Sequence, residues 1–210
     1  MCVIILAEKK LPSLENLKKC EKENPDGLGF SWFKKGKVFW EKGLFKIEEK
    51  WEKIQNITLP IVFHFRIGTV GGKTAPLCHP FPISENADLS LNGETPFGVL
   101  YHNGHWEDWK ETCLRSLTAQ GLQFPDGNWS DSRAIAWLCY YHSENILSLL
   151  EGQKFIFFSP QKIKIFGNFS PFEGCLYSNL NWNSPAASFP LAWPKKNWDN
   201  WEWEKGNKKT

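Results

Sequence analysis

The chain begins with a cysteine directly behind the start methionine, and a run of apolar residues follows it. Residues 2–7 read Cys-Val-Ile-Ile-Leu-Ala. A short continuous apolar run rich in branched side chains is typical of a buried β-strand. The sequence therefore predicts a buried strand at the start of the chain, with Cys2 at its leading end.

Cys2 is also a candidate nucleophile. A small residue after the start methionine is the usual condition for removal of that methionine, so we expect Cys2 to become the first residue. It would then carry both a thiol, which titrates near pH ~8.5, and an α-amine, which titrates near pH ~7.7–8.0. The amine can take the proton of the thiol, so one residue supplies nucleophile and base. The alternative is a small second residue with no chemical role.

Charge and cysteine spacing exclude several classes of protein. The formal net charge of the 210 residues is +2, which argues against a protein that coats nucleic acid or is drawn strongly to membranes. The six cysteines include no Cys-x-x-Cys pair, so neither a zinc knuckle nor a redox motif is indicated. The apolar start is too short for a secretion signal. We expect a cytoplasmic protein with reduced thiols and with neither a metal nor a cofactor.

Strand patterns dominate both ends of the chain, and helical patterns lie between them. This order favours an α+β sandwich over a doubly wound parallel sheet. Strands are expected at 2–7, on both sides of Lys34–Lys37, and at 59–66, 97–102, 154–158 and 163–169. Helices are expected from Ser13 to about Glu23, within 45–54, over 106–117 and after Ser130.

Arg66 ends the strand at 59–66 and enters a glycine-rich connection that contains Thr69. A guanidinium in this position can grip a carboxylate through two parallel hydrogen bonds. The alternative is an arginine on the surface that caps the strand.

Asn103 and Gly104 follow the strand at 97–102. An Asn-Gly pair commonly closes a β-hairpin. In a functional interpretation, the Asn103 side-chain amide and the Gly104 backbone N–H form an oxyanion hole.

Asp131 stands in the first turn of the helix that Ser130 is expected to cap. An acid there ordinarily interacts with the helix dipole. It can equally receive the ammonium group of a substrate.

In this order, these motifs resemble the glutaminase domain of class II glutamine amidotransferases, a branch of the N-terminal-nucleophile hydrolases. The resemblance runs from Cys2 to Leu138. Its motifs are MCVI at the start, Asn24-Pro-Asp-Gly-Leu-Gly, FRIGT followed by CHPF, YHNG, and SDSRAIAWL. One departure is Arg133, which stands where an acidic residue is frequent in that family.

The resemblance implies a four-layer αββα sandwich of two mostly antiparallel sheets, and a set of site residues. Cys2 would attack the side-chain amide of glutamine, forming a γ-glutamyl thioester and releasing ammonia. Asn103 and Gly104 would stabilise the oxyanion. Arg66 would hold the α-carboxylate of glutamine and Asp131 its α-ammonium, with Thr69 shaping the same pocket.

The expected organisation is a glutaminase-like domain over residues 2–192 and a tail rich in Trp and Lys over residues 193–210. Ammonia would pass to an acceptor on a separate partner protein, since no acceptor domain fits after Leu138. Two alternatives remain open. One is an amide hydrolase of the same type that acts on γ-glutamyl or acyl-amino substrates without ammonia transfer. The other is a non-catalytic binding protein with the same fold.

Overall fold

The computed structural model describes residues 1–68, 72–123 and 125–183, which form two antiparallel sheets between layers of helix. The strands are β1 (Val3–Ala7), β2 (Leu28–Lys34), β3 (Lys37–Leu44), β4 (Ile61–Phe65), β5 (Phe81–Pro82), β6 (Asn92–Thr95), β7 (Val99–Asn103), β8 (Lys154–Phe158), β9 (Ile163–Phe166), β10 (Ser170–Phe172) and β11 (Cys175–Tyr177). The α-helices are α1 (Leu14–Glu23), α2 (Trp51–Gln55), α3 (Trp109–Gln120) and α4 (Asp131–His142). Short 3-10 helices are η1 (Ile47–Lys50), η2 (Ala75–Leu77), η3 (Glu144–Leu149) and η4 (Asn181–Asn183).

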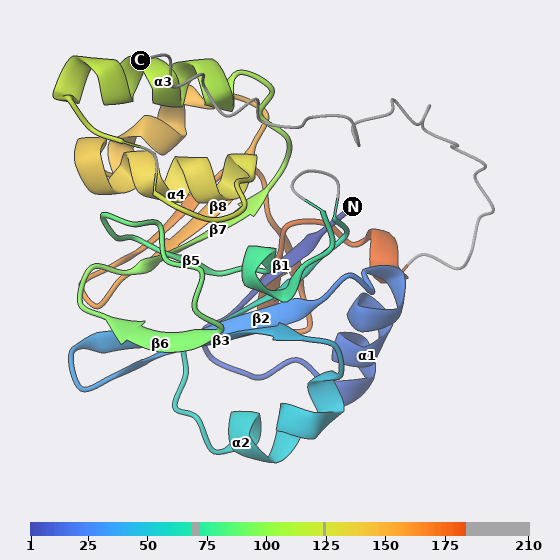
Figure 1. Cartoon of the computed structure of the whole chain (residues 1–210). Helices are drawn as coiled ribbons and strands as arrows, with labels where there is room; N and C mark the ends of the chain where they lie inside the picture. Colours follow the sequence, from blue (N-terminus) through green and yellow to red (C-terminus); the bar gives the residue numbers. More distant parts are fainter. Residues whose placement is uncertain (69–71, 124, 184–210) are drawn as a thin grey trace, which may run out of the picture.

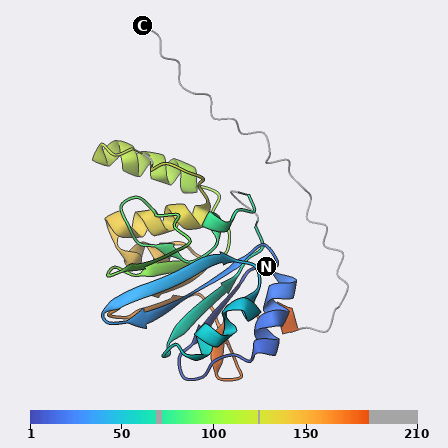
Figure 2. The same ribbon diagram turned by 60° about the horizontal axis from the view of Figure 1, so that its bottom comes forward.

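The larger sheet has the strand order β10-β11-β1-β4-β2-β3-β6, and the smaller one has the order β5-β7-β8-β9. Figure 1 shows α3 and α4 over the outer side of β5, β7 and β8, while α1 and α2 lie beyond β2 and β3. The tilted view in Figure 2 shows the same stacking from another side. This is the four-layer αββα sandwich expected from the resemblance.

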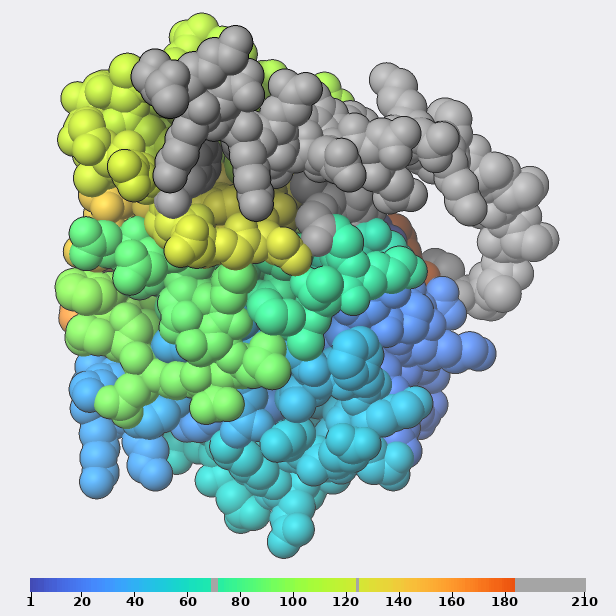
Figure 3. All heavy atoms as spheres, in the orientation of Figure 1, coloured from blue at the N-terminus to red at the C-terminus, as the bar shows by residue number. Residues whose placement is uncertain are grey.

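Three apolar interfaces hold the layers together. Between the sheets lie residues such as Leu6, Val62 and Ile156. A second cluster, which includes Leu17 and Phe63, fills the space between the larger sheet and α1. A third cluster, which includes Ile135 and Phe155, packs α4 onto the smaller sheet. In Figure 3 the early, blue to teal part of the chain forms the lower half, and the yellow helix region lies above it.

Several local predictions are confirmed, namely two helix caps and one hairpin turn. Ser13 caps α1, because its side chain accepts the N–H of Asn16 at 3.2 Å. β2 and β3 form a hairpin around Lys35 and Gly36, both with positive φ, the geometry of a two-residue type I′ turn. Ser130 caps α4 in the same way as Ser13 caps α1.

Other features differ from expectation. Helix α3 begins at Trp109, three residues later than the pattern indicated, and the N–H of Trp106 instead donates to the Asp131 carboxylate at 3.2 Å. Asn103 and Gly104 do not close a hairpin, because β7 pairs with β5 and β8. Strands β5, β6, β10 and β11 were not predicted, since each has only two to four residues.

The boundary expected between residues 192 and 193, and the Trp-rich tail after it, lie outside the described residues. Within the described ranges, no helix has the length and apolar character needed to cross a membrane.

Candidate active site

Cys2 and Arg66 are brought side by side by the pairing of β1 with β4. The strands are antiparallel, and Val3 lies opposite Phe65, so the residue before β1 meets the residue after β4. The Cys2 sulfur accepts the N–H of Ile67 at 3.2 Å, and the thiol lies 3.4 Å from the carbonyl oxygen of the same residue. The sulfur is therefore held against the backbone that directly follows Arg66.

Asn103 reaches the same point from the other sheet. Its side-chain amide donates to the carbonyl oxygen of Cys2 and, at 2.9 Å, to Ser178 Oγ. A second amide, from Asn179, donates to the same Cys2 carbonyl at 2.8 Å. The backbone of Cys2 is thus fixed where the two sheets meet.

The environment of Cys2 sets its acidity in two opposing ways. Burial raises the pKa of the Cys2 thiol, whereas the N–H of Ile67, the N-terminal ammonium and the Arg66 charge lower it. The net direction is upward while Met1 is present. Met1 itself is 69% exposed. Its removal would place the ammonium on Cys2 itself.

Arg66 is buried, with 4% of its surface exposed, so the alternative of an arginine on the surface is wrong. Its Nη2 donates to the carbonyl of Gly72 at 2.7 Å, and its backbone N–H donates to Gly27 at 2.9 Å. Gly68 lies so close that a β-carbon there would stand 2.8 Å from Arg66 Nη1. The guanidinium therefore has a fixed position, and its charge acts on the Cys2 thiol.

Asp26 organises the segment that follows Arg66. Its carboxylate accepts the N–H of Gly68 at 2.9 Å and pairs with Lys73 at 2.8 Å. Partial burial favours a higher pKa for Asp26, but the bonds from Lys73 and Gly68 hold that pKa below its usual range. The sequence analysis marked Asp26 only as part of the motif Asn24-Pro-Asp-Gly-Leu-Gly. Thr69 falls in the gap of the described residues, so its predicted contribution is untested.

Asp131 belongs to the same network through the loop after Gly104. Its carboxylate accepts the N–H groups of Ser132 (2.8 Å) and Trp106 (3.2 Å), and it lies 3.6 Å from Nδ1 of His105. The first of these bonds pairs a backbone N–H in the first turn of α4 with the acid, as expected for an acidic residue that interacts with the helix dipole. The other two tie Asp131 to the segment that begins with Asn103 and Gly104.

The structure thus brings together Cys2, Arg66, Asn103, Gly104 and Asp131. Each of them contacts another member of this set, either directly or through a residue next to it in the chain. Sequence reasoning missed Ser178 and Asn179, because the strand before them, β11, is too short to be detected by periodicity. It also missed Gln153, which bonds to the residues flanking Asn103 and Gly104. Among the described residues, no group of three or more His, Cys, Asp or Glu is arranged to hold a metal ion. All six cysteines are free thiols.

Comparison with known proteins finds likeness in structure only. No protein-family model matches the chain, and no curated protein matches it. One similar solved structure is described as the allosteric regulatory enzyme of purine biosynthesis, with 19% identity and a TM-score of 0.58 over 84% of this chain and 40% of that chain. Another is glutamine phosphoribosylpyrophosphate amidotransferase from B. subtilis complexed with ADP and GMP, with 17% identity and a TM-score of 0.52 over 84% of this chain and 41% of that one.

At sequence identities of 19% and 17%, the similarity to these structures shows a shared fold and no more. It agrees with the four-layer αββα fold expected from the sequence motifs. The chain spans about two fifths of the length of the solved structures that it matches.

Proposed function

We propose that the protein hydrolyses the side-chain amide of glutamine and releases ammonia, with Cys2 as the nucleophile after removal of Met1. The observation that carries the proposal is the position of the Cys2 sulfur, which lies beside Arg66 at the edge where Asn103 joins the two sheets. The similar fold of an enzyme described as an amidotransferase supports the same reaction class.

The first step is the activation of the thiol. The free α-amine of Cys2 takes the thiol proton, directly or through one water, and the thiolate attacks the carbonyl carbon of the glutamine side chain. The C=O electron pair moves onto oxygen and forms a tetrahedral oxyanion. The ammonium then returns its proton to the amide nitrogen, which leaves as ammonia, and a thioester remains on the sulfur. Water cleaves that thioester to glutamate with the amine again as the base.

Asn103 and Gly104 are proposed to stabilise the oxyanion. In the structure both hydrogens of the Asn103 amide are donated, one to Cys2 and one to Ser178. Because Asn179 also donates to the Cys2 carbonyl, Asn103 can turn one N–H toward the oxyanion without leaving that carbonyl unpaired. Donors of this kind typically lower a barrier by about 3–4 kcal/mol each.

Arg66 and Asp131 are proposed to recognise the two charged ends of glutamine. The buried guanidinium would bind the α-carboxylate and the Asp131 carboxylate the α-ammonium, with Thr69 shaping the pocket between them. Charge-assisted hydrogen bonds stabilise such contacts by about 1.5–3 kcal/mol each. An amide that lacks either charge would therefore be a poor substrate.

The ammonia is proposed to reach an acceptor held by a separate partner protein. In the solved structure described as an amidotransferase, the matched part is 41% of that chain. A partner would supply the activation of the acceptor.

The test is ammonia release from glutamine by the wild type, by Cys2→Ala and by Cys175→Ser. Cys175 is a matched control, because it is a buried thiol that donates to the carbonyl of Lys10 at 3.2 Å, a bond that serine can keep. We expect activity in the wild type and the control and none in Cys2→Ala. Release from γ-glutamyl or acyl-amino compounds but not from glutamine would contradict the substrate assignment, and a fully active Cys2→Ala would reject the nucleophile.

A further inference from the structure

One glutamine side chain spans the segment that carries the oxyanion donors. Gln153 stands directly before β8, the strand that pairs with β7. Its Oε1 is bonded to Nε2 of His102 at 2.9 Å, and its Nε2 donates to the carbonyl of His105 at 2.8 Å. A single planar amide therefore connects the residue before Asn103 to the residue after Gly104.

Gly104 lies directly beneath this amide. A β-carbon at Gly104 would stand 1.7 Å from Oε1 of Gln153 and 2.9 Å from Nε2 of His102. Real β-carbons do not approach other atoms so closely, so a side chain at Gly104 would have to displace the Gln153 amide. The close approach also leaves the backbone of Gly104 little freedom to move toward Gln153.

His102 extends the connection to α4. It is 2% exposed, it stacks on Phe155 with ring centroids 4.9 Å apart, and its Nδ1 lies 2.9 Å from Ser132 Oγ. Because the amide nitrogen of Gln153 faces a carbonyl, its oxygen must accept, so His102 carries its proton on Nε2. Nδ1 then accepts the hydroxyl of Ser132, the residue next to Asp131.

We infer that Gln153 is a positioning residue that fixes the turn presenting Asn103 and Gly104 to the reacting carbonyl. The inference rests on the proposed glutamine hydrolysis. Bonds to both ends of the turn set the direction of the Gly104 N–H relative to the Cys2 sulfur. Oxyanion donors act only when they are held in place before the charge develops, and a misplacement of about 1 Å can cost about a hundredfold in rate.

The experiment compares Gln153→Ala, Gln153→Glu and the control Gln161→Ala, whose side chain is exposed on the turn after β8. Kinetics with glutamine are measured together with the rate at which iodoacetamide alkylates Cys2. Alkylation displaces iodide at a saturated carbon and forms no oxyanion, so it reports the thiol alone. Cooperative unfolding of each variant is recorded as a check on folding.

For Gln153→Ala we expect kcat to fall about ten- to a hundredfold, with KM changed less than about threefold and an unchanged alkylation rate. Gln153→Glu keeps the acceptor for His102 and loses the donor to His105, so its kcat should lie between those of Gln153→Ala and the wild type. Gln161→Ala should match the wild type.

Three results would overturn the inference. The first is an unchanged kcat in Gln153→Ala. The second is a fall in kcat accompanied by equal changes in KM and alkylation, which would indicate general damage to the site. The third is loss of cooperative unfolding in both Gln153 variants, which would leave Gln153 a purely structural role. A wild type without glutamine hydrolysis is a different result, because it rejects the proposed function as well.

Discussion

Gly68 offers a way to test the position of Arg66 without removing its charge. A β-carbon at Gly68 would stand 2.8 to 3.2 Å from three atoms of the guanidinium, and no positive φ prevents a substitution there. Gly68→Ala should therefore displace the guanidinium. Loss of one charge-assisted bond should raise KM for glutamine about tenfold, with a smaller effect on kcat, as measured by steady-state kinetics.

Arg66→Lys provides the comparison for that variant. It keeps a positive charge but loses the paired donors of the guanidinium, so its KM should rise at least as much as that of Gly68→Ala. A normal KM in both variants would show that Arg66 does not hold the substrate carboxylate.

Asn103 and Asn179 form a matched pair for separating catalysis from anchoring. Both donate to the carbonyl of Cys2, but only Asn103 is proposed to stabilise the oxyanion. Asn103→Ala should lower kcat about a hundred- to a thousandfold with little change in KM, and Asn179→Ala should lower it less than about threefold. Equal losses of kcat in the two variants would contradict the oxyanion role.

At the scale of elements, Arg133 fixes the start of α4 and so the position of Asp131. Its guanidinium donates to four backbone carbonyls from two loops, those of Asn86, Ala87, Asp126 and Asn128. These four bonds explain why an arginine stands at position 133, where an acidic residue is frequent in the family that the sequence resembles. The Arg133 side chain is buried, and its bonds cross-link the loop at residues 86–87 to the loop at residues 126–128.

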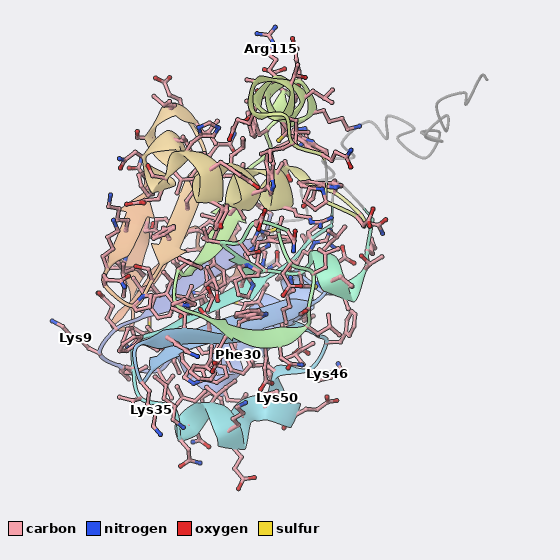
Figure 4. The ribbon with its side chains drawn as sticks, turned by 60° about the vertical axis from the view of Figure 1, so that its left-hand side comes forward. Lys9, Phe30, Lys35, Lys46, Lys50 and Arg115 are labelled. Atoms are coloured by element: carbon pink, nitrogen blue, oxygen red, sulfur yellow. The ribbon has the colours of Figure 1, made fainter. Side chains whose placement is uncertain are left out.

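Arg133→Met should therefore lower the free energy of unfolding by about 3 kcal/mol, because one buried and three part-buried carbonyls lose a charged donor. Urea denaturation measures this. The control is Arg115→Met on α3, whose side chain is 79% exposed and points away from the molecule in Figure 4. It should change stability by less than about 0.5 kcal/mol. Equal effects would contradict the role given to Arg133.

The elements that were predicted correctly carry their own local signals. Ser13 and Ser130 are serine caps, and Lys35-Gly36 has a glycine where the turn requires positive φ. Strand β11 has no such signal, because its three residues are a strand only through pairing with β1 and β10. Ser178 and Asn179, which anchor Cys2, follow that strand and were missed for the same reason.

At the scale of the whole molecule, neutral histidines between the sheets make stability depend on pH. His64 and His79 stack with centroids 4.0 Å apart, next to Tyr101. Burial lowers the pKa of His64 to about 3, and burial also moves the pKa of His79 well below its usual range. In the unfolded chain both titrate near ~6.5.

Below pH ~6.5 the unfolded chain binds protons that the folded chain does not, so stability falls as the pH falls. Each histidine contributes up to about 1.4 kcal/mol per pH unit. Urea titrations from pH 7 to 5 measure the effect of these two histidines together with that of His102, whose pKa burial also lowers, because carboxylates titrate at lower pH. His64→Gln should reduce the slope of the free energy of unfolding against pH. A free energy of unfolding that is constant over this range would contradict the account.

The layered architecture was accessible from the sequence because strand and helix patterns and family-like motifs agreed. The sequence did not predict the contacts between elements that lie far apart in the chain. The bond of Asn103 to Cys2 joins residues 101 positions apart, and the two bonds of Gln153, to His102 and His105, join residues 51 and 48 positions apart. No local pattern specifies such contacts, since they depend on how the two sheets are placed against each other.

The most direct test of the central claim is the mass of the protein after reaction with a diazoketone or chloroketone analogue of glutamine, followed by peptide mapping. The account predicts one adduct, on Cys2, in molecules that have lost Met1, and protection of Cys2 by excess glutamine. An adduct on another cysteine, or on Cys2 in molecules that retain Met1, would contradict it.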